Sequence, residues 1–182
     1  TDANHEPAAF IQQSPAAVAE KLAAILAEIH PDVVITFSEE GGYLHPDHIH
    51  INESVVALSE QAAELVPHLY FSSFPREFFL EIANQDHGAF AGMSEERRNR
   101  MGQPLAAFTV VMNVEPYIER KTAAFAAHKT QQPKEGERDF LENDEDRRRF
   151  AMYEYYIHVP TASDAPDPLV LLASDLPGST VK

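Results

Sequence analysis

The chain has 182 residues, 44% of them hydrophobic, and this length suits one globular domain that buries a core without disulfide bonds. It contains no cysteine, which excludes thiolate metal sites and favours a reducing compartment, so we expect a cytoplasmic location. The formal net charge of −15 argues against nucleic acid as a partner, and no apolar run is long enough to predict a transmembrane segment.

The first part of the chain predicts a linker and then a helix. Residues 1–13 show no regular pattern, and we interpret them as the linker. Ser14 is suited to cap a helix and Pro15 to occupy its first position. Apolar residues then recur at intervals of three and four until Pro31, which predicts an amphipathic helix that ends there.

Two predicted strands follow, separated by a second helix. Residues 32–37 form a short β-branched apolar run, typical of a buried strand. A polar turn comes next, and apolar positions between Ile51 and Leu65 mark the second helix. Residues 68–74 form the second strand. The order helix, strand, loop, helix, strand predicts an α/β fold with a parallel sheet.

The remaining elements have weaker patterns. Residues 91–104 are polar and are expected to form a surface excursion. We predict a strand over residues 108–114, a helix over residues 116–131 and another strand within residues 149–159. Residues 160–182 are rich in Pro, Asp and Ser, and we expect them to form an irregular or mobile tail.

The densest polar chemistry lies directly after the first predicted strand, in the stretch TFSEEGGYLHPDHIHINE, residues 36–53. In open α/β sheets, ligands bind beyond the carboxyl ends of the strands, where this stretch falls. Gly41 and Gly42 allow a tight turn with positive φ. His45 falls near the start of the next helix and His48 three residues later, so both imidazoles can face one place.

Two opposing influences act on this histidine pair. The partial positive charge at a helix N-terminus favours a neutral imidazole, which is the form that binds metal. A carboxylate at Asp47 instead favours a protonated ring and fixes its tautomer. One imidazole as a metal ligand and the other as a cationic hydrogen-bond donor would use both influences. The spacing alone is equally compatible with polar residues at a helix start that have no chemical role.

Two neighbouring histidines receive a different interpretation. A second His-Pro-Asp sequence begins at His30, at the opposite end of the predicted strand and about 20 Å of extended chain away, so we interpret it as a helix stop. His50 is expected on a different helix face from His48, at the surface or behind the site.

The stretch GGYLHPDH after a strand resembles the second signature of the LmbE/PIG-L family. These are zinc-dependent N-deacetylases of N-acetylglucosamine conjugates, including the mycothiol, bacillithiol and glycosylphosphatidylinositol pathway enzymes. Residues 117–131 resemble a later family helix that carries lysine, histidine and glutamine, and residues 147–156 resemble a closing aromatic pattern more loosely. Leu44 stands where the nearest family members commonly have glycine. The resemblance extends from about residue 14 to residue 159.

The resemblance implies a role for each matching residue of the turn. His48 would be a zinc ligand. His45 would stabilise the oxyanion and protonate the leaving amine, and Asp47 would orient His45. Tyr43 would reach over the site and help to hold the oxyanion. In the helix that follows later, His128 and Gln131 would lie near the bound substrate.

The resemblance also implies a Rossmann-like, LmbE-type three-layer sandwich with a mostly parallel sheet. The family's first signature, A-H-P-D-D-E, supplies a histidine and an aspartate to zinc and a second aspartate as general base, and it is absent here. Residues 1–182 are therefore expected to be the C-terminal part of one deacetylase domain whose first strands lie outside this chain.

These expectations extend to the partners of the chain. We expect an amino-sugar conjugate as substrate, zinc as cofactor, and an oligomer formed with the missing N-terminal part or another copy. The chain alone is expected to be inactive. The alternative is a non-catalytic acidic α/β module that docks to a partner chain.

Overall fold

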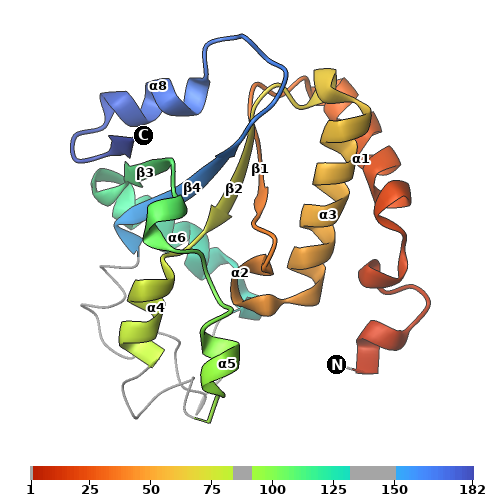
Figure 1. Ribbon diagram of the computed structural model, residues 1–182, viewed down its shortest axis with the longest axis horizontal. Helices are drawn as coiled ribbons and strands as arrows, with labels where there is room; N and C mark the ends of the chain where they lie inside the picture. Colours follow the sequence, from red (N-terminus) through yellow and green to blue (C-terminus); the bar gives the residue numbers. More distant parts are fainter. Residues whose placement is uncertain (1, 84–91, 132–150) are drawn as a thin grey trace.

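The computed structural model describes residues 2–83, 92–131 and 151–182 (Figure 1). The strands form one open sheet in the order β1-β2-β4-β3-β5. Their bounds are β1 Val34–Phe37, β2 Leu69–Ser73, β3 Val110–Asn113, β4 Tyr153–Val159 and β5 Thr180–Val181. Each strand predicted from the sequence is therefore present in a slightly shorter form, and β5 is additional.

The directions of the strands differ from the prediction. β1 and β2 pair in parallel, but the pairings β2–β4, β3–β4 and β3–β5 are antiparallel. A mostly parallel sheet is therefore wrong for the described strands, although the α/β class is confirmed. β1, β2 and β3 run in one direction, and β4 enters between β2 and β3 in the opposite one. Apolar periodicity reveals that a strand exists but contains no information on its direction or neighbours.

The described helices are mostly amphipathic and surround the sheet. They are α1 Pro15–Ile29, α2 Gly41–Leu44, α3 Pro46–Gln61, α4 Arg76–Ala83, α5 Glu95–Arg98, α6 Ile118–Ala127 and α8 Pro168–Asp175. Ser14 caps α1 by accepting a hydrogen bond from the backbone N–H of Ala17, as predicted. No described helix is both long and apolar enough to cross a membrane.

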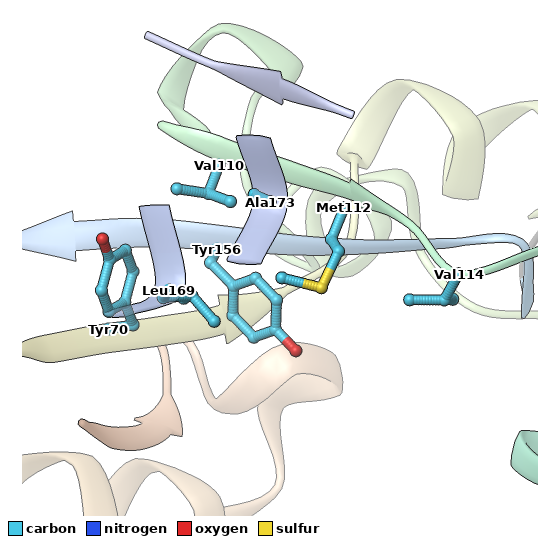
Figure 2. Close-up of a cluster of buried hydrophobic side chains, with 7 residues drawn as sticks. All are labelled: Tyr70, Val110, Met112, Val114, Tyr156, Leu169 and Ala173. Carbon is cyan, nitrogen blue, oxygen red and sulfur yellow. The ribbon is translucent and has the colours of Figure 1, made fainter. Parts of the chain in front are cut away.

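Helices cover both faces of the sheet, so the three-layer arrangement is confirmed. α1 and α3 lie side by side on one face, and α8 lies on the other (Figure 1). Leu69 of β2 packs in the cluster under α1 and α3, whereas its neighbour Tyr70 packs with Leu169 and Ala173 of α8 (Figure 2). This follows from the alternation of side chains along a strand.

Both ends of the described chain are more ordered than the sequence predicted. The expected irregular tail contains α8, which Asp167 caps through backbone N–H groups, and β5, which pairs with β3. Asp167 and Pro168 are the cap and first position of this helix, which composition alone does not distinguish from a loop. In the expected linker, the ring of Phe10 packs edge-on against His50 of α3, with ring centroids 4.9 Å apart.

Candidate active site

The turn between β1 and α3 has the backbone that the glycines predict. Gly41 and Gly42 have φ values of +63° and +69°, as expected. A Cβ on Gly41 would lie 2.8 Å from Cγ1 of Ile49 and 3.0 Å from its backbone nitrogen, so any other residue would displace the start of α3. Leu44 also has a positive φ of 66°, which is strained for a residue with a side chain.

Glu40 holds this turn against the carboxyl ends of the two parallel strands. Its carboxylate accepts hydrogen bonds from the hydroxyls of Ser38, after β1, and Ser73, at the end of β2, and from the side-chain amide of Gln103. Ser38 is only 1% exposed. The sequence places two glutamates before the glycines, but local pattern does not show which one accepts these bonds.

The segment predicted as a surface excursion is part of the support for this turn. The backbone N–H of Gly102 donates to the carbonyl of Gly42 over 2.9 Å, and the Arg76 guanidinium donates to the carbonyls of Met101 and Gly102. Met101 is 1% exposed. The prediction of a surface excursion is therefore wrong at this end of the segment, because long-range packing buries what its polar composition suggested would be exposed.

The backbone gives the two histidines opposite hydrogen-bonding patterns. His45 is the N-cap of α3, and its Nδ1 accepts the backbone N–H of Asp47 over 3.2 Å. His48 Nδ1 lies 3.2 Å from the carbonyl oxygen of Gly41, to which only an N–H can donate. The neutral His45 ring therefore carries its proton on Nε2, and the neutral His48 ring presents a lone pair at Nε2.

Aromatic packing brings the predicted turn residues together. The centroids of the His45 and His48 rings are 4.7 Å apart, and the Tyr43 ring lies 5.7 Å from the former and 5.2 Å from the latter. Phe37, the last residue of β1, stacks on His48 at 3.7 Å. Tyr43 is 48% exposed, so its hydroxyl can approach a ligand from solvent. The stacking by Phe37 was not anticipated from the sequence.

The environment of His48 favours its neutral form. Burial lowers the pKa of His48 below its ordinary value, and the neighbouring His45 lowers it further. The hydrogen bond to the carbonyl of Gly41 and the negative charge of Asp47 oppose this shift without overcoming it. A neutral imidazole with a free Nε2 lone pair is the form required of a metal ligand.

Asp47 acts differently from the expectation. Within the described residues, its carboxylate makes no hydrogen bond to the His45 ring, and the backbone N–H of Asp47 is what orients that ring. While this capping bond is kept, Nε2 is the ring nitrogen through which His45 can donate a hydrogen bond. The Asp47 charge acts instead on His48, as an attraction that favours its protonated form.

The residues predicted to lie near the substrate are not joined to this turn by any described contact. His128 is exposed at the end of α6, where its Nδ1 donates to the carbonyl of Ala124 over 2.9 Å. Gln131 ends a 3-10 turn, and its side chain lies outside the described structure. Lys121, from the same helix, forms an ion pair with Glu154 of β4 at 3.1 Å. Residues 147–150 of the closing pattern also lie outside the described residues.

The two other histidines have clear structural positions. His30 caps the C-terminus of α1 in a left-handed conformation, so its interpretation as a helix stop is confirmed. His50 is 8% exposed and packs under Phe10, so of its two expected positions, at the surface or behind the site, the surface position is excluded. The short segment before α1 covers it, which helical periodicity could not show.

The turn offers an incomplete set of metal ligands. His48 fits a ligand by its tautomer and lowered pKa, whereas the Nδ1 of His45 is occupied by the backbone. Where the structure describes the chain, the group of three potential ligands is elsewhere, at His68, His158 and Asp167. A catalytic zinc site usually has three protein ligands. The donor set at the turn thus fits a contribution of one clear ligand to such a site.

Comparisons with known proteins agree with this local geometry. The family described as PIG-L, GlcNAc-PI de-N-acetylase, matches residues 4–59, which include β1, the glycine turn and most of α3. The 1D-myo-inositol 2-acetamido-2-deoxy-alpha-D-glucopyranoside deacetylase of Acidothermus cellulolyticus is 35% identical over 162 residues, which cover 86% of this chain and 55% of the relative. The protein of the same name from Thermobifida fusca is 31% identical over 177 residues, which cover 90% of this chain and 62% of the relative.

The chain therefore spans less than two thirds of the length of these relatives. Within that span, the match includes the turn in which the two histidines are held in opposite tautomers. The similarity of sequence and the arrangement of this turn lead to one conclusion: the chain belongs to the PIG-L (LmbE) family.

Proposed function

We propose that this protein takes part in the zinc-dependent hydrolysis of the acetamide of an N-acetylglucosamine-type conjugate. The observation that carries the proposal is the opposite tautomers of His45 and His48, whose rings lie 4.7 Å apart. One ring presents a lone pair at Nε2, and the other, in its neutral form, presents an N–H donor. Relatives named as deacetylases of an acetamido sugar support this function over a docking module.

His48 is the ligand that this chain would provide. Its Nδ1–H donates to the Gly41 carbonyl and its ring stacks on Phe37, so its orientation is set before any metal binds. When bound, zinc polarises an amide carbonyl and lowers the pKa of water. The lowered pKa of His48 keeps this ring in its ligand form at neutral pH.

His45 and Tyr43 would stabilise the charge that develops on the carbonyl oxygen. The Nε2–H of His45 is the donor that its capping bond leaves available, and Tyr43 has a half-exposed hydroxyl beside it. Each well-placed donor to an oxyanion contributes about 2.7–4 kcal/mol. The proton on His45 Nε2 is also the one available for the leaving amine. Asp47 would serve by fixing the His45 ring through its backbone N–H.

His128 and Gln131 remain candidates for contacts to the sugar conjugate, from the resemblance of their helix to the family. Their place at the end of α6 leaves His128 exposed to solvent and able to meet a ligand. Their contribution is tested by comparing KM for the His128→Ala and Gln131→Ala variants with that of the unchanged protein, at equal zinc content.

We further propose that the remaining zinc ligands and the general base come from a polypeptide segment outside residues 1–182. The incomplete donor set at His48 supports this, as does the position of β1 at the edge of the sheet. Ile35 and Phe37 of β1 are 46% and 39% exposed. A bare strand edge with exposed apolar side chains is suited to accept a further strand, from the rest of the protein or from another copy.

Acetate release from an N-acetylglucosaminyl inositol tests the activity, with the natural protein that contains these residues. His48→Gln should abolish zinc retention and activity together. His45→Gln should keep zinc but lose most of kcat, because only the oxyanion donor is removed. Zinc retention that survives the His48 change would overturn the ligand assignment, and unchanged kcat in the His45 variant would overturn the oxyanion role.

A second experiment tests the incomplete site. The 182-residue chain, refolded alone, should show no acetate release at equimolar zinc. Native mass spectrometry of the natural protein should show this chain with additional polypeptide, covalently continuous or associated. A monomeric 182-residue chain that deacetylates the substrate would contradict the requirement for outside ligands. The cytoplasmic location remains a prediction, which fractionation of the source cells would test.

A further inference from the structure

A second group of potential metal ligands lies at the opposite end of the strands from the glycine turn. His68 directly precedes β2, His158 is near the end of β4, and Asp167 caps α8. One potential ligand atom from each of these three residues lies within 4.8 Å of the others. We call these three residues the clasp cluster. It lies at the start of β2, and His48 lies near the other end of the parallel strands, about 13 Å of extended chain away, which is the length of β2.

Strand register explains why the three side chains converge. Tyr70 of β2 is paired with His158 of β4, so both side chains point to the same face of the sheet. Tyr70 packs with α8, which identifies that face, and His68 is two residues before Tyr70 and shares its side. Asp167 is at the first turn of α8, directly over this face. Figure 2 shows the Tyr70 side chain next to Leu169, which lies in the first turn of α8.

His68 is an unsatisfied buried group. It is 5% exposed, and its Nε2 has no hydrogen-bond partner among the described residues. Its Nδ1 lies 3.7 Å from Oδ2 of Asp167, which is longer than a hydrogen bond. The ring is therefore buried with Nδ1 facing a carboxylate beyond hydrogen-bond distance, a separation into which a metal ion fits, while Nε2 has no described partner.

The carboxylate of Asp167 is already held in position. Its Oδ1 accepts the backbone N–H groups of Leu169 and Val170 at the start of α8. The Tyr70 hydroxyl donates to Oδ2 over 2.5 Å, and burial raises the pKa of Tyr70, so this hydroxyl keeps its proton. Hydrogen bonds of this kind orient the ligands of metal sites.

We propose that the clasp cluster binds a divalent transition metal of the zinc type, separate from the site at His48, and that this metal fastens the connection between β4 and α8 to the sheet. Two imidazoles and one carboxylate form a donor set that zinc accepts, with solvent as the fourth ligand. Tetrahedral ligands of zinc lie about 3.4 Å from one another. The 3.7 Å between His68 Nδ1 and Asp167 Oδ2 is close to this value, and the atoms of the whole group, which lie within 4.8 Å of one another, would have to draw together around the ion.

The hydrogen bond from Thr161 Oγ1 to the carbonyl of Pro67 fastens the same connection nearby, at 2.6 Å. A bound metal would add a second fastening between segments that are far apart in sequence. The site stands independently of the proposed deacetylation, because none of its residues belongs to the glycine turn.

Zinc titration of the full 182-residue chain tests the clasp cluster, with the turn silenced by His45→Gln and His48→Gln. Calorimetry should still detect one equivalent of zinc, and zinc should raise the thermal midpoint. In this background, His158→Gln and Asp167→Asn should each abolish both effects. Asparagine still caps a helix, so Asp167→Asn preserves α8.

Tyr70→Phe should weaken zinc binding about 10- to 100-fold, because it frees the carboxylate. His30→Gln, which changes an exposed histidine at the end of α1, should leave it unchanged.

Absence of zinc binding in the silenced background would overturn the proposal. So would a zinc-induced rise of the thermal midpoint that survives both His158→Gln and Asp167→Asn. Circular dichroism before the titration verifies that each variant is folded, and the visible spectrum of cobalt(II) supplies a second readout of coordination. A further outcome is a chain that binds neither zinc nor cobalt(II) and yet shows a thermal midpoint that rises on acidification. That result would overturn the metal site and would assign the cluster to an ion pair between His68 and Asp167.

Discussion

The ring of Phe37 lies nearly parallel to the ring of His48, with centroids 3.7 Å apart and 4° between the planes. Phe37 ends β1 and His48 is in the first turn of α3, so the stack joins the strand to the helix start. The Asn52 side chain adds a second link by donating to the carbonyl of Phe37 over 2.7 Å. With the bond to Gly41, these contacts define the direction of His48 Nε2.

Removal of the stack should loosen this ligand without removing it. Phe37→Ala should weaken the zinc affinity of the natural protein roughly 2- to 13-fold, because an aromatic pair contributes about 0.5–1.5 kcal/mol. Ile35→Ala, two residues earlier on the same side of β1 and similarly exposed, is the matched control. Equal effects of both substitutions, measured by competition with a chelator, would show that the stack does not position His48.

At Leu44, a glycine variant should be more stable than an alanine variant, which is the reverse of the usual order of these two residues. Its φ of 66° costs an L-residue roughly 1–2 kcal/mol, while its side chain packs against the cluster around Phe79. Leu44→Ala loses the packing and keeps the strain, whereas Leu44→Gly loses the packing and relieves the strain. The glycine variant should therefore be about 1 kcal/mol more stable than the alanine variant in urea unfolding. Greater stability of the alanine variant would contradict the strain.

Glu40 should be important for the folding of the turn, whereas its exposed neighbour Glu39 should not. Glu40→Ala removes the acceptor of Ser38, Ser73 and Gln103 and leaves the buried Ser38 hydroxyl without that partner. The free energy of unfolding should fall by at least about 2 kcal/mol. Glu39→Ala should change it by less than about 0.5 kcal/mol. Similar values for both variants would refute the role of Glu40.

The protonation of His48 should be shifted in opposite directions by its two charged neighbours. In the metal-free chain, NMR titration of His48 should give a pKa below the ordinary 6.5. Asp47→Asn should lower this pKa further, because it removes an attracting charge, and His45→Gln should raise it, because it removes a repelling one. Shifts of the same sign in both variants would disprove this account.

The same shift affects stability. Because the pKa of His48 is lower in the folded chain than in the unfolded chain, its favourable contribution is complete above pH 6.5 and is lost as the pH falls below that value. His48→Gln should therefore flatten the decline of the thermal midpoint on the acidic side. A decline of equal slope in both proteins would show that other groups cause it.

Much of the local structure could be predicted from the sequence because its causes are local. The cap at Ser14, the positive φ values of Gly41 and Gly42, and the entry of His45 and His48 into a helix after a strand all depend on neighbours within one or two turns. The α/β class follows from the same alternation of periods. The family resemblance then rested on that short stretch.

Local patterns in the sequence predicted β1 to β4, the helices α1 and α3, and the place of His45 and His48 after the first strand. Three features depend on tertiary contacts alone. β4 pairs antiparallel with β2, and α8, within residues 160–182, covers a face of the sheet. A backbone N–H and a backbone carbonyl assign opposite tautomers to the neutral rings of His45 and His48. The clasp cluster depends on tertiary packing more than any other feature. Tyr70 and Asp167 are 97 residues apart and meet only when the sheet and α8 pack, because periodicity within a segment contains no information about the partner across the fold.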